Sequence, residues 1–147
     1  MCKESVVRAA LTAAQEHCAL CPRRCGAVRR ETAGLCGMGA ELKVARAALH
    51  YWEEPCISGR DGSGTVFFSG CTLRCVFCQN REISAGGFGR AISVERLREV
   101  FRELEAAGAS NINLVSPTQF APWIALALEE VPGIPVVWNT GGYERVE

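Results

Sequence analysis

Seven of the nine cysteines of this chain lie in two short groups, and the second group limits what the chain can fold into. Of nine cysteines, three follow the spacing Cys71-x3-Cys75-x2-Cys78 in the segment CTLRCVFCQN. Three thiols this close on one loop can converge on a soft metal centre. The segment follows directly on TVFFSG, an apolar run of strand type. We therefore expect a metal-binding loop at the end of a buried strand.

This second group contains three cysteines rather than four. A cubane iron–sulfur cluster held by three thiolates keeps one iron without a protein ligand, and an open metal position can bind a small molecule. A structural zinc site would need a fourth ligand, and neither Cys56 nor His50 has the usual spacing for one. The spacing favours an iron–sulfur centre, with a zinc site or unligated thiols as the alternatives.

The first group lies near the N-terminus, in a loop rich in glycine and arginine. Its four members are Cys18, Cys21, Cys25 and Cys36. Four thiols suffice for a closed zinc site or for a second cluster, so we predict a candidate second metal site, zinc or iron–sulfur. Unligated thiols are the alternative. The odd cysteine count and the lack of an export signal at the N-terminus predict metal binding in the cytoplasm rather than disulfides.

The remaining sequence alternates between strand and helix signals. Residues 5–17 have apolar side chains at helical spacing, residues 18–39 form a loop, and residues 42–50 fit a strand or a helix. Strands are predicted at Thr65–Gly70, Asn111–Ser116 and Pro135–Thr140. Helices are predicted between the N-cap Ser93 and Gly108, which lies just beyond the helix end, and over Ala121–Glu130. The order β-α-β-α-β predicts an α/β fold with a parallel sheet whose edges stay open.

Functional groups gather at the carboxyl ends of parallel strands. In this chain those ends carry the Cys71 loop, then Ser116-Pro117-Thr118, then Asn139-Thr140. We therefore expect the cysteines, Ser116, Thr118 and Asn139 to lie along one edge of the sheet.

The charges balance, with 16 Lys and Arg against 16 Asp and Glu. This balance predicts no broad surface for nucleic acid and none for a membrane. No apolar run reaches the length of a membrane span, and the 48% hydrophobic content is typical of a globular domain.

The CxxxCxxC loop with Phe77 before its last cysteine resembles the signature of the radical S-adenosylmethionine (SAM) superfamily. The wider string EEPCISGRDGSGTVFFSGCTLRCVFCQN, with NLVSPT and WNTGGY downstream, resembles more narrowly the pyruvate formate-lyase activating enzyme-like iron–sulfur proteins. The resemblance implies a partial (β/α) barrel, of which residues 59–147 would supply about the first three β/α units. Residues 1–58 would form a Cys-rich N-terminal extension.

The resemblance also implies a chemistry. Cys71, Cys75 and Cys78 would hold a 4Fe–4S cluster whose open iron chelates SAM, and one electron would cleave SAM to methionine and a 5′-deoxyadenosyl radical. Phe77 would lie beside the adenine. Many superfamily members place Gly-Gly-Glu after the second strand to hold the SAM amino group, and this chain has Ser116-Pro117-Thr118 there. Ser116, Thr118 and Asn139 are therefore the SAM-binding candidates.

Two function classes follow from this resemblance. The first is a radical SAM oxidoreductase, for which we expect a lyase-activating role that installs a glycyl radical on a partner protein, with flavodoxin or ferredoxin as the electron donor. The second is a non-catalytic iron–sulfur or zinc-binding fragment. Because the chain ends after the third strand, we expect a truncated form that binds a cluster but turns over poorly. Robust single-chain turnover would contradict that expectation.

Overall fold

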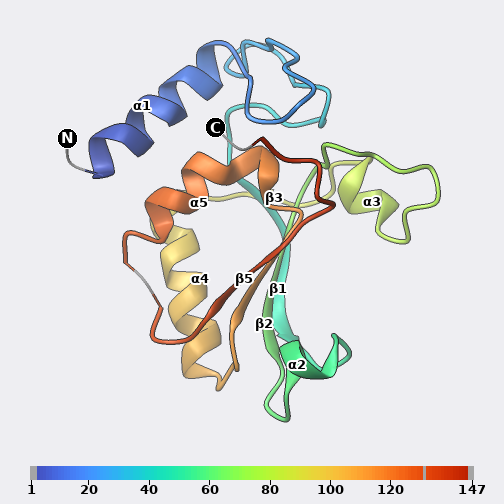
Figure 1. Ribbon diagram of the computed structural model, residues 1–147, viewed down its shortest axis with the longest axis vertical. Helices are drawn as coiled ribbons and strands as arrows, with labels where there is room; N and C mark the ends of the chain where they lie inside the picture. The colour runs from blue at the N-terminus through green and yellow to red at the C-terminus, as the bar shows by residue number, and fades with distance from the viewer. Residues whose placement is uncertain (1–2, 131, 146–147) are drawn as a thin grey trace.

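The computed structural model describes residues 3–130 and 132–145 (Figure 1). Its helices are α1 (Lys3–Glu16), α2 (Pro55–Ser58), α3 (Arg81–Ser84), α4 (Val94–Ala106) and α5 (Ala121–Ala127), with the 3-10 turn η1 (Thr118–Phe120) before α5. The strands are β1 (Lys43–His50), β2 (Ser63–Phe68), β3 (Arg90–Ala91), β4 (Ile112–Val115) and β5 (Val136–Asn139). They form one sheet in the order β3-β1-β2-β4-β5.

The three predicted strands are present and parallel. β2 pairs with β4, and β4 pairs with β5, both in parallel register. Helix α4 connects the first pair, and η1 with α5 connects the second. The mixed α/β class is thus confirmed, and the sheet is consistent with part of a radical SAM fold. The predicted boundaries differ by a few residues, most at α5, which ends at Ala127 rather than Glu130.

One edge of the parallel sheet is covered, so the prediction of open edges is wrong there. Residues 43–50, which fitted a strand or a helix, form β1 and pair antiparallel with β2 over most of its length. The short strand β3 then pairs with the start of β1. An antiparallel neighbour needs only a turn as its connection, and the segment containing α2 and Gly62 supplies one. β1 lies inside the predicted extension of residues 1–58, and that domain boundary stays a prediction.

Helices α4 and α5 cover one face of the sheet, and α1 packs against α5 (Figure 1). The core between them consists of fully or almost fully buried apolar side chains. These are Val66 and Phe68 of β2, Ile112 and Leu114 of β4, Leu97 and Phe101 of α4, and Phe120 and Ile124 from η1 and α5. Burying side chains of this size stabilises the fold by about 1.5–3 kcal/mol each. These buried side chains therefore hold the parallel strands in place.

The opposite face of these strands carries polar side chains beside the half-buried Phe67 and Val115. Because side chains alternate along a strand, Thr65 and Asn113 lie on the face away from α4. Both are fully buried, and neither polar atom of the Asn113 side chain has a partner within the described residues. Asn139, the last residue of β5, pairs with Val115 of β4. Val115 follows Leu114, which is in the core, so Val115 and Asn139 lie on the same face as Asn113. Asn139 therefore places a polar side chain of this face at the carboxyl ends of the strands.

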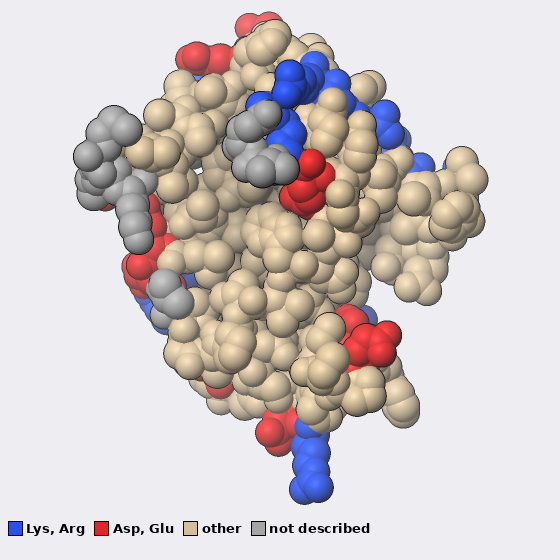
Figure 2. Space-filling view, in the orientation of Figure 1, with Lys and Arg blue, Asp and Glu red and all other residues tan. Residues whose placement is uncertain are grey.

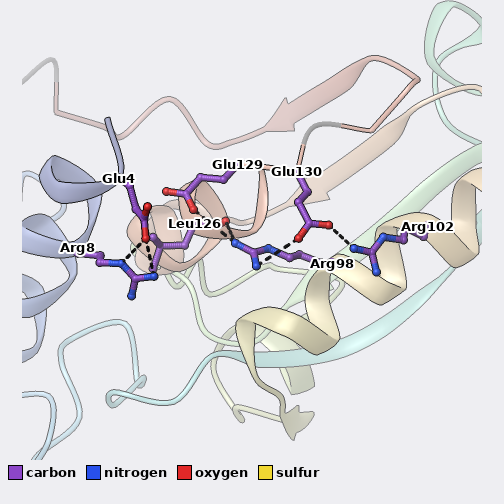
Figure 3. Close-up of polar contacts among 7 residues, drawn as sticks. All are labelled: Glu4, Arg8, Arg98, Arg102, Leu126, Glu129 and Glu130. Carbon is purple, nitrogen blue, oxygen red and sulfur yellow. Dashed lines mark hydrogen bonds and ion pairs between the residues drawn. The ribbon is translucent and has the colours of Figure 1, made fainter. Parts of the chain in front are cut away.

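Arginines of α4 close the end of α5 (Figure 3). Arg98 donates to the backbone carbonyl of Leu126 at 2.7 Å and lies 3.5 Å from the carboxylates of both Glu129 and Glu130. Arg102 forms a further ion pair with Glu130. Cations stabilise the carbonyl end of a helix, whereas exposed ion pairs by themselves contribute little. Among these polar contacts, the one with Leu126 therefore contributes most to holding α5 against α4.

The start of α4 offers a stability test. The Ser93 hydroxyl accepts a hydrogen bond from the Arg96 backbone N–H at 3.1 Å, as the predicted N-cap requires. Ser93→Ala should lower the free energy of unfolding by about 1 kcal/mol, measured by urea denaturation. Ser93→Asp, which keeps a capping oxygen, should restore most of the loss. Equal stability of the alanine variant and the parent chain would show that the cap contributes nothing.

Among the described residues, no helix combines the length and the apolar content needed to cross a bilayer.

Candidate metal centre

A cavity of about 240 Å³ opens at the carboxyl ends of β2, β4 and β5. It is lined by residues from three segments, one at the end of each of these strands; the segment after β4 includes the 3-10 turn η1. The lining consists of Cys71, Thr72, Leu73, Cys75, Cys78, Ser116, Thr118, Gln119, Asn139, Thr140 and Gly141. The cavity thus brings together all three cysteines of the second group with three of the four residues predicted to bind SAM. The roles of these residues stay predictions.

The cysteine loop begins at Gly70, two residues after the end of β2, with a positive φ of 77°. A Cβ atom there would lie 2.4 Å from Cγ of Met38 and 2.7 Å from the carbonyl oxygen of Cys36, so no other residue fits. The Cys78 N–H closes a turn on the Cys75 carbonyl at 3.2 Å. Arg74, also at positive φ, donates to the carbonyls of Leu35 and Ala85. The loop therefore has a defined path on the sheet edge.

The donor set fits a cluster with an open iron. The three thiols are partly exposed and face one cavity, and no fourth cysteine lines it. Within residues 3–130 and 132–145, however, no three Cys, His, Asp or Glu side chains already surround one point as metal ligands. The Cys78 sulfur instead accepts a hydrogen bond from the Ser84 hydroxyl at 3.4 Å. Binding a cluster therefore requires rotation of cysteine side chains, while the backbone already brings them to one cavity.

Gln119 is a site residue that the sequence analysis missed. Its side-chain amide is buried and donates to the carbonyls of Ser69, Gly70 and Ser116 at 2.7–3.0 Å. These carbonyls lie just after β2 and β4, so Gln119 ties the cysteine loop to the Ser116 loop. In the sequence, Gln119 is visible only as a single amide side chain between Thr118 and Phe120. Nothing in the sequence indicates which carbonyls this side chain contacts.

Glu144 is the second missed residue. The Thr118 hydroxyl donates to its carboxylate at 2.5 Å, and the Thr140 hydroxyl donates to the same oxygen. Thr118 and Thr140 both line the cavity, so Glu144 places a negative charge next to its wall. Ser116, at a positive φ of 53°, lies on the same rim. The Thr118 hydroxyl is therefore engaged with a carboxylate of the chain.

Phe77, the fourth predicted SAM-binding residue, lies outside the cavity lining. Its side chain is 87% exposed, and that of its neighbour Val76 is 89% exposed. Both project from the cysteine loop into solvent. The predicted contact of Phe77 with an adenine ring would therefore require this part of the loop to fold over the bound nucleoside.

The first cysteine group lies beside the second. Cys18 and Cys36 are buried, and Cys21 and Cys25 are partly exposed. Burial raises the pKa of the Cys36 thiol. Burial also raises the pKa of the Cys25 thiol, but hydrogen bonds from the backbone at Ala27, at Leu35 and at Cys25 itself, and from Cys18, outweigh it, so that pKa lies below its ordinary value.

The comparison with protein families agrees with the site. The family model of the Radical SAM superfamily matches residues 65–146, which is more than half of the chain. The chain therefore belongs to the radical SAM superfamily. Members of this superfamily generally use a 4Fe–4S cluster and SAM, and the three cysteines of the cavity lie inside the matched region.

A relative extends the likeness over the N-terminal region. Uncharacterized protein MJ0674 of Methanocaldococcus jannaschii is 31% identical over 142 residues, covering 90% of this chain. The aligned part is 40% of that relative, so the chain spans well under half of its length. No solved structure gives a significant match.

Proposed function

We propose that this chain is the cluster- and SAM-binding part of a radical SAM enzyme. The observation that carries the proposal is the cavity in which Cys71, Cys75 and Cys78 meet Ser116, Thr118 and Asn139. When bound, the cluster would supply the electron that cleaves SAM to a 5′-deoxyadenosyl radical. The chain would bind both groups and keep water away from them.

Each side of the cavity has a separate task in this proposal. The thiols on the β2 side would hold the cluster as thiolates, leaving one iron without a protein ligand. The Ser116 hydroxyl on the β4 side and the Asn139 amide on the β5 side would hydrogen-bond the polar end of SAM. The buried Gln119 fixes the distance between the two sides because it contacts both loops.

Glu144 supplies the carboxylate that the Ser116-Pro117-Thr118 segment lacks. We propose that the Glu144 carboxylate accepts a hydrogen bond from the ammonium group of SAM. The Thr118 and Thr140 hydroxyls would hold this carboxylate in position. A charge-assisted hydrogen bond is about twice as strong as a neutral one. Such a contact would also orient the amino acid end of SAM toward the cysteine side of the cavity.

Glu144→Gln tests this role. The variant should bind the cluster with unchanged iron content but bind SAM roughly tenfold more weakly, because it loses a charged partner. Isothermal titration of the reconstituted protein with SAM measures the affinity. Glu99→Gln, which changes an exposed carboxylate of α4, is the matched control and should bind SAM as the parent chain does. Unchanged SAM affinity in Glu144→Gln would remove Glu144 from the site.

The partner and electron donor belong to the proposal. A flavodoxin or ferredoxin would deliver the electron, and a glycyl-radical enzyme of the pyruvate formate-lyase type is the proposed protein substrate, in a lyase-activating, oxidoreductase role. The support is the narrower resemblance of the CISGRDGSGTVFFSGC and NLVSPT segments. The alternative is a non-catalytic iron–sulfur or zinc-binding fragment. Formation of 5′-deoxyadenosine from SAM by the reduced, reconstituted chain would favour the enzyme, and its absence would favour the alternative.

A further inference from the structure

The two cysteine groups are joined by direct contacts between their loops. The Cys71 backbone N–H donates to the Cys36 carbonyl at 3.3 Å. The Arg23 side chain donates to the Thr72 carbonyl at 2.6 Å, and Arg74 donates to the Leu35 carbonyl at 3.2 Å. Gly70 packs on Met38, as its missing side chain allows. The segment from Cys18 to Met38 therefore supports the loop that carries Cys71.

The first group is already folded as a compact thiol-rich turn. The Cys18 N–H donates to the Ala27 carbonyl and the Gly26 N–H donates to the Cys18 carbonyl, both at 3.0 Å, which closes the loop around Cys21. A Cβ atom at Gly34 would lie 3.4 Å from the Cys25 sulfur and 3.6 Å from the Cys36 sulfur. The Cys25 and Cys36 sulfurs therefore lie close to the same glycine, while no three thiols of the described residues yet surround one point.

A buried cation lies next to these thiols. Arg29 is 2% exposed and donates to the Gly39 and Gln119 carbonyls at 2.8 Å and 2.6 Å. Its guanidinium also lies over the rings of Trp123 and Phe120, 4.7 Å and 5.4 Å from their centroids. Its remaining terminal nitrogen, Nη2, is buried without a hydrogen-bond partner, and no carboxylate of the described residues pairs with it. The guanidinium charge acts on Cys36. A buried charge is costly unless an opposite charge accompanies it.

Four thiolates around one divalent ion carry a net negative charge, which would supply the counter-charge that Arg29 lacks. Four thiolates complete a closed tetrahedral zinc site without any further ligand. The positive charge of the surrounding arginines would also stabilise a negatively charged thiolate site. Figure 2 shows Lys and Arg side chains gathered along the upper edge of the molecule, where Figure 1 draws the N-terminal loop.

We propose that Cys18, Cys21, Cys25 and Cys36 bind one tetrahedral ion of the Zn²⁺ type, and that this ion fixes the loop that carries Cys71, Cys75 and Cys78. The ion would hold Cys36 in place, and the Cys36 carbonyl would in turn hold the Cys71 N–H. The metal would thus preorganise the cavity without taking part in its chemistry. The proposed ion site does not depend on the proposed function. Its role in supporting the cluster-binding loop does rest on the proposed function.

The experiment uses chain stripped of metal by a chelator under anaerobic conditions and then supplied with zinc. The zinc that remains after removal of excess metal is measured by mass spectrometry. The parent chain, Cys56→Ser and Cys75→Ser should each retain about one zinc, because a tetrahedral structural site needs only the first group. Cys25→Ser should retain much less. Retention in Cys25→Ser together with loss in Cys75→Ser would overturn the site.

The supporting role is tested in Cys75→Ser alone, which lacks a complete cluster site. Hydrogen exchange of the Cys71 backbone amide is compared with and without zinc in this same chain, so neither the folding of a first-group variant nor SAM chemistry affects the result. Zinc at saturation should slow that exchange about tenfold or more. Zinc binding with unchanged exchange would overturn the supporting role, and a second iron–sulfur cluster in place of zinc would overturn the single-ion site.

Discussion

Cys75→Ala should lose the cluster almost completely. Cys75 is the middle member of the group, and the cavity contains only two further cysteines, Cys71 and Cys78. Loss of an outer-shell partner alone commonly lowers metal affinity 10–100-fold, so loss of a ligand should lower it by at least that factor. Bound iron and sulfide, measured after anaerobic reconstitution, report the effect.

The matched control is Cys56→Ala. Cys56 is exposed on α2, at the opposite end of β2 from the cysteine loop, and belongs to neither group. Its removal should leave iron content and folding unchanged. If Cys75→Ala bound as much iron as Cys56→Ala, the cavity would not be the cluster site.

Gln119→Ala should destabilise the chain and damage the site together. The substitution removes the donor shared by the Ser69, Gly70 and Ser116 carbonyls in a buried position. Leaving buried acceptors without partners costs about 1–3 kcal/mol each, and partial relaxation brings the expected loss in unfolding free energy to roughly 2–4 kcal/mol. Urea denaturation measures the loss, and cluster reconstitution should give a lower yield because the two loops are no longer tied.

Gln15→Ala provides the control for Gln119. Gln15 lies on α1, where its side chain accepts hydrogen bonds from the exposed Arg30, so its removal should change stability by no more than about 0.5 kcal/mol. A similar small change for Gln119→Ala would mean that the carbonyls find water or other partners. The link between the cysteine loop and the Ser116 loop would then be structurally unimportant.

Periodicity predicted the parallel half of the fold. The apolar runs of β2 and β4 and the apolar face of α4, with Ser93 as its cap, are local patterns with one structural solution. Residues 43–50 were different, because KVARAALH suits a strand or a helix and its state depends on β2, which offers an edge to pair with. Pairing with β2, rather than local propensity, therefore determines that this segment is a strand.

The parts of the candidate site that are defined by local sequence motifs were predictable. The parts that depend on contacts between residues distant in the sequence were not. The spacing of Cys71, Cys75 and Cys78 and the strand ends at Ser116 and Asn139 were visible in the sequence. The roles of Gln119 and Glu144 arise from hydrogen bonds to residues on other loops, 49–50 positions away for Gln119 and 26 positions away for Glu144. The sequence has no local pattern for such contacts.

If the cavity holds a cluster with one iron open to SAM, SAM binding must alter that cluster. Electron paramagnetic resonance of the reconstituted, reduced chain, recorded with and without SAM, measures this effect. We expect SAM to change the spectrum of the reduced cluster, because SAM would bind the iron that no cysteine holds. A cluster whose spectrum is the same with and without SAM would contradict this expectation and leave the chain as an iron–sulfur protein without a SAM site.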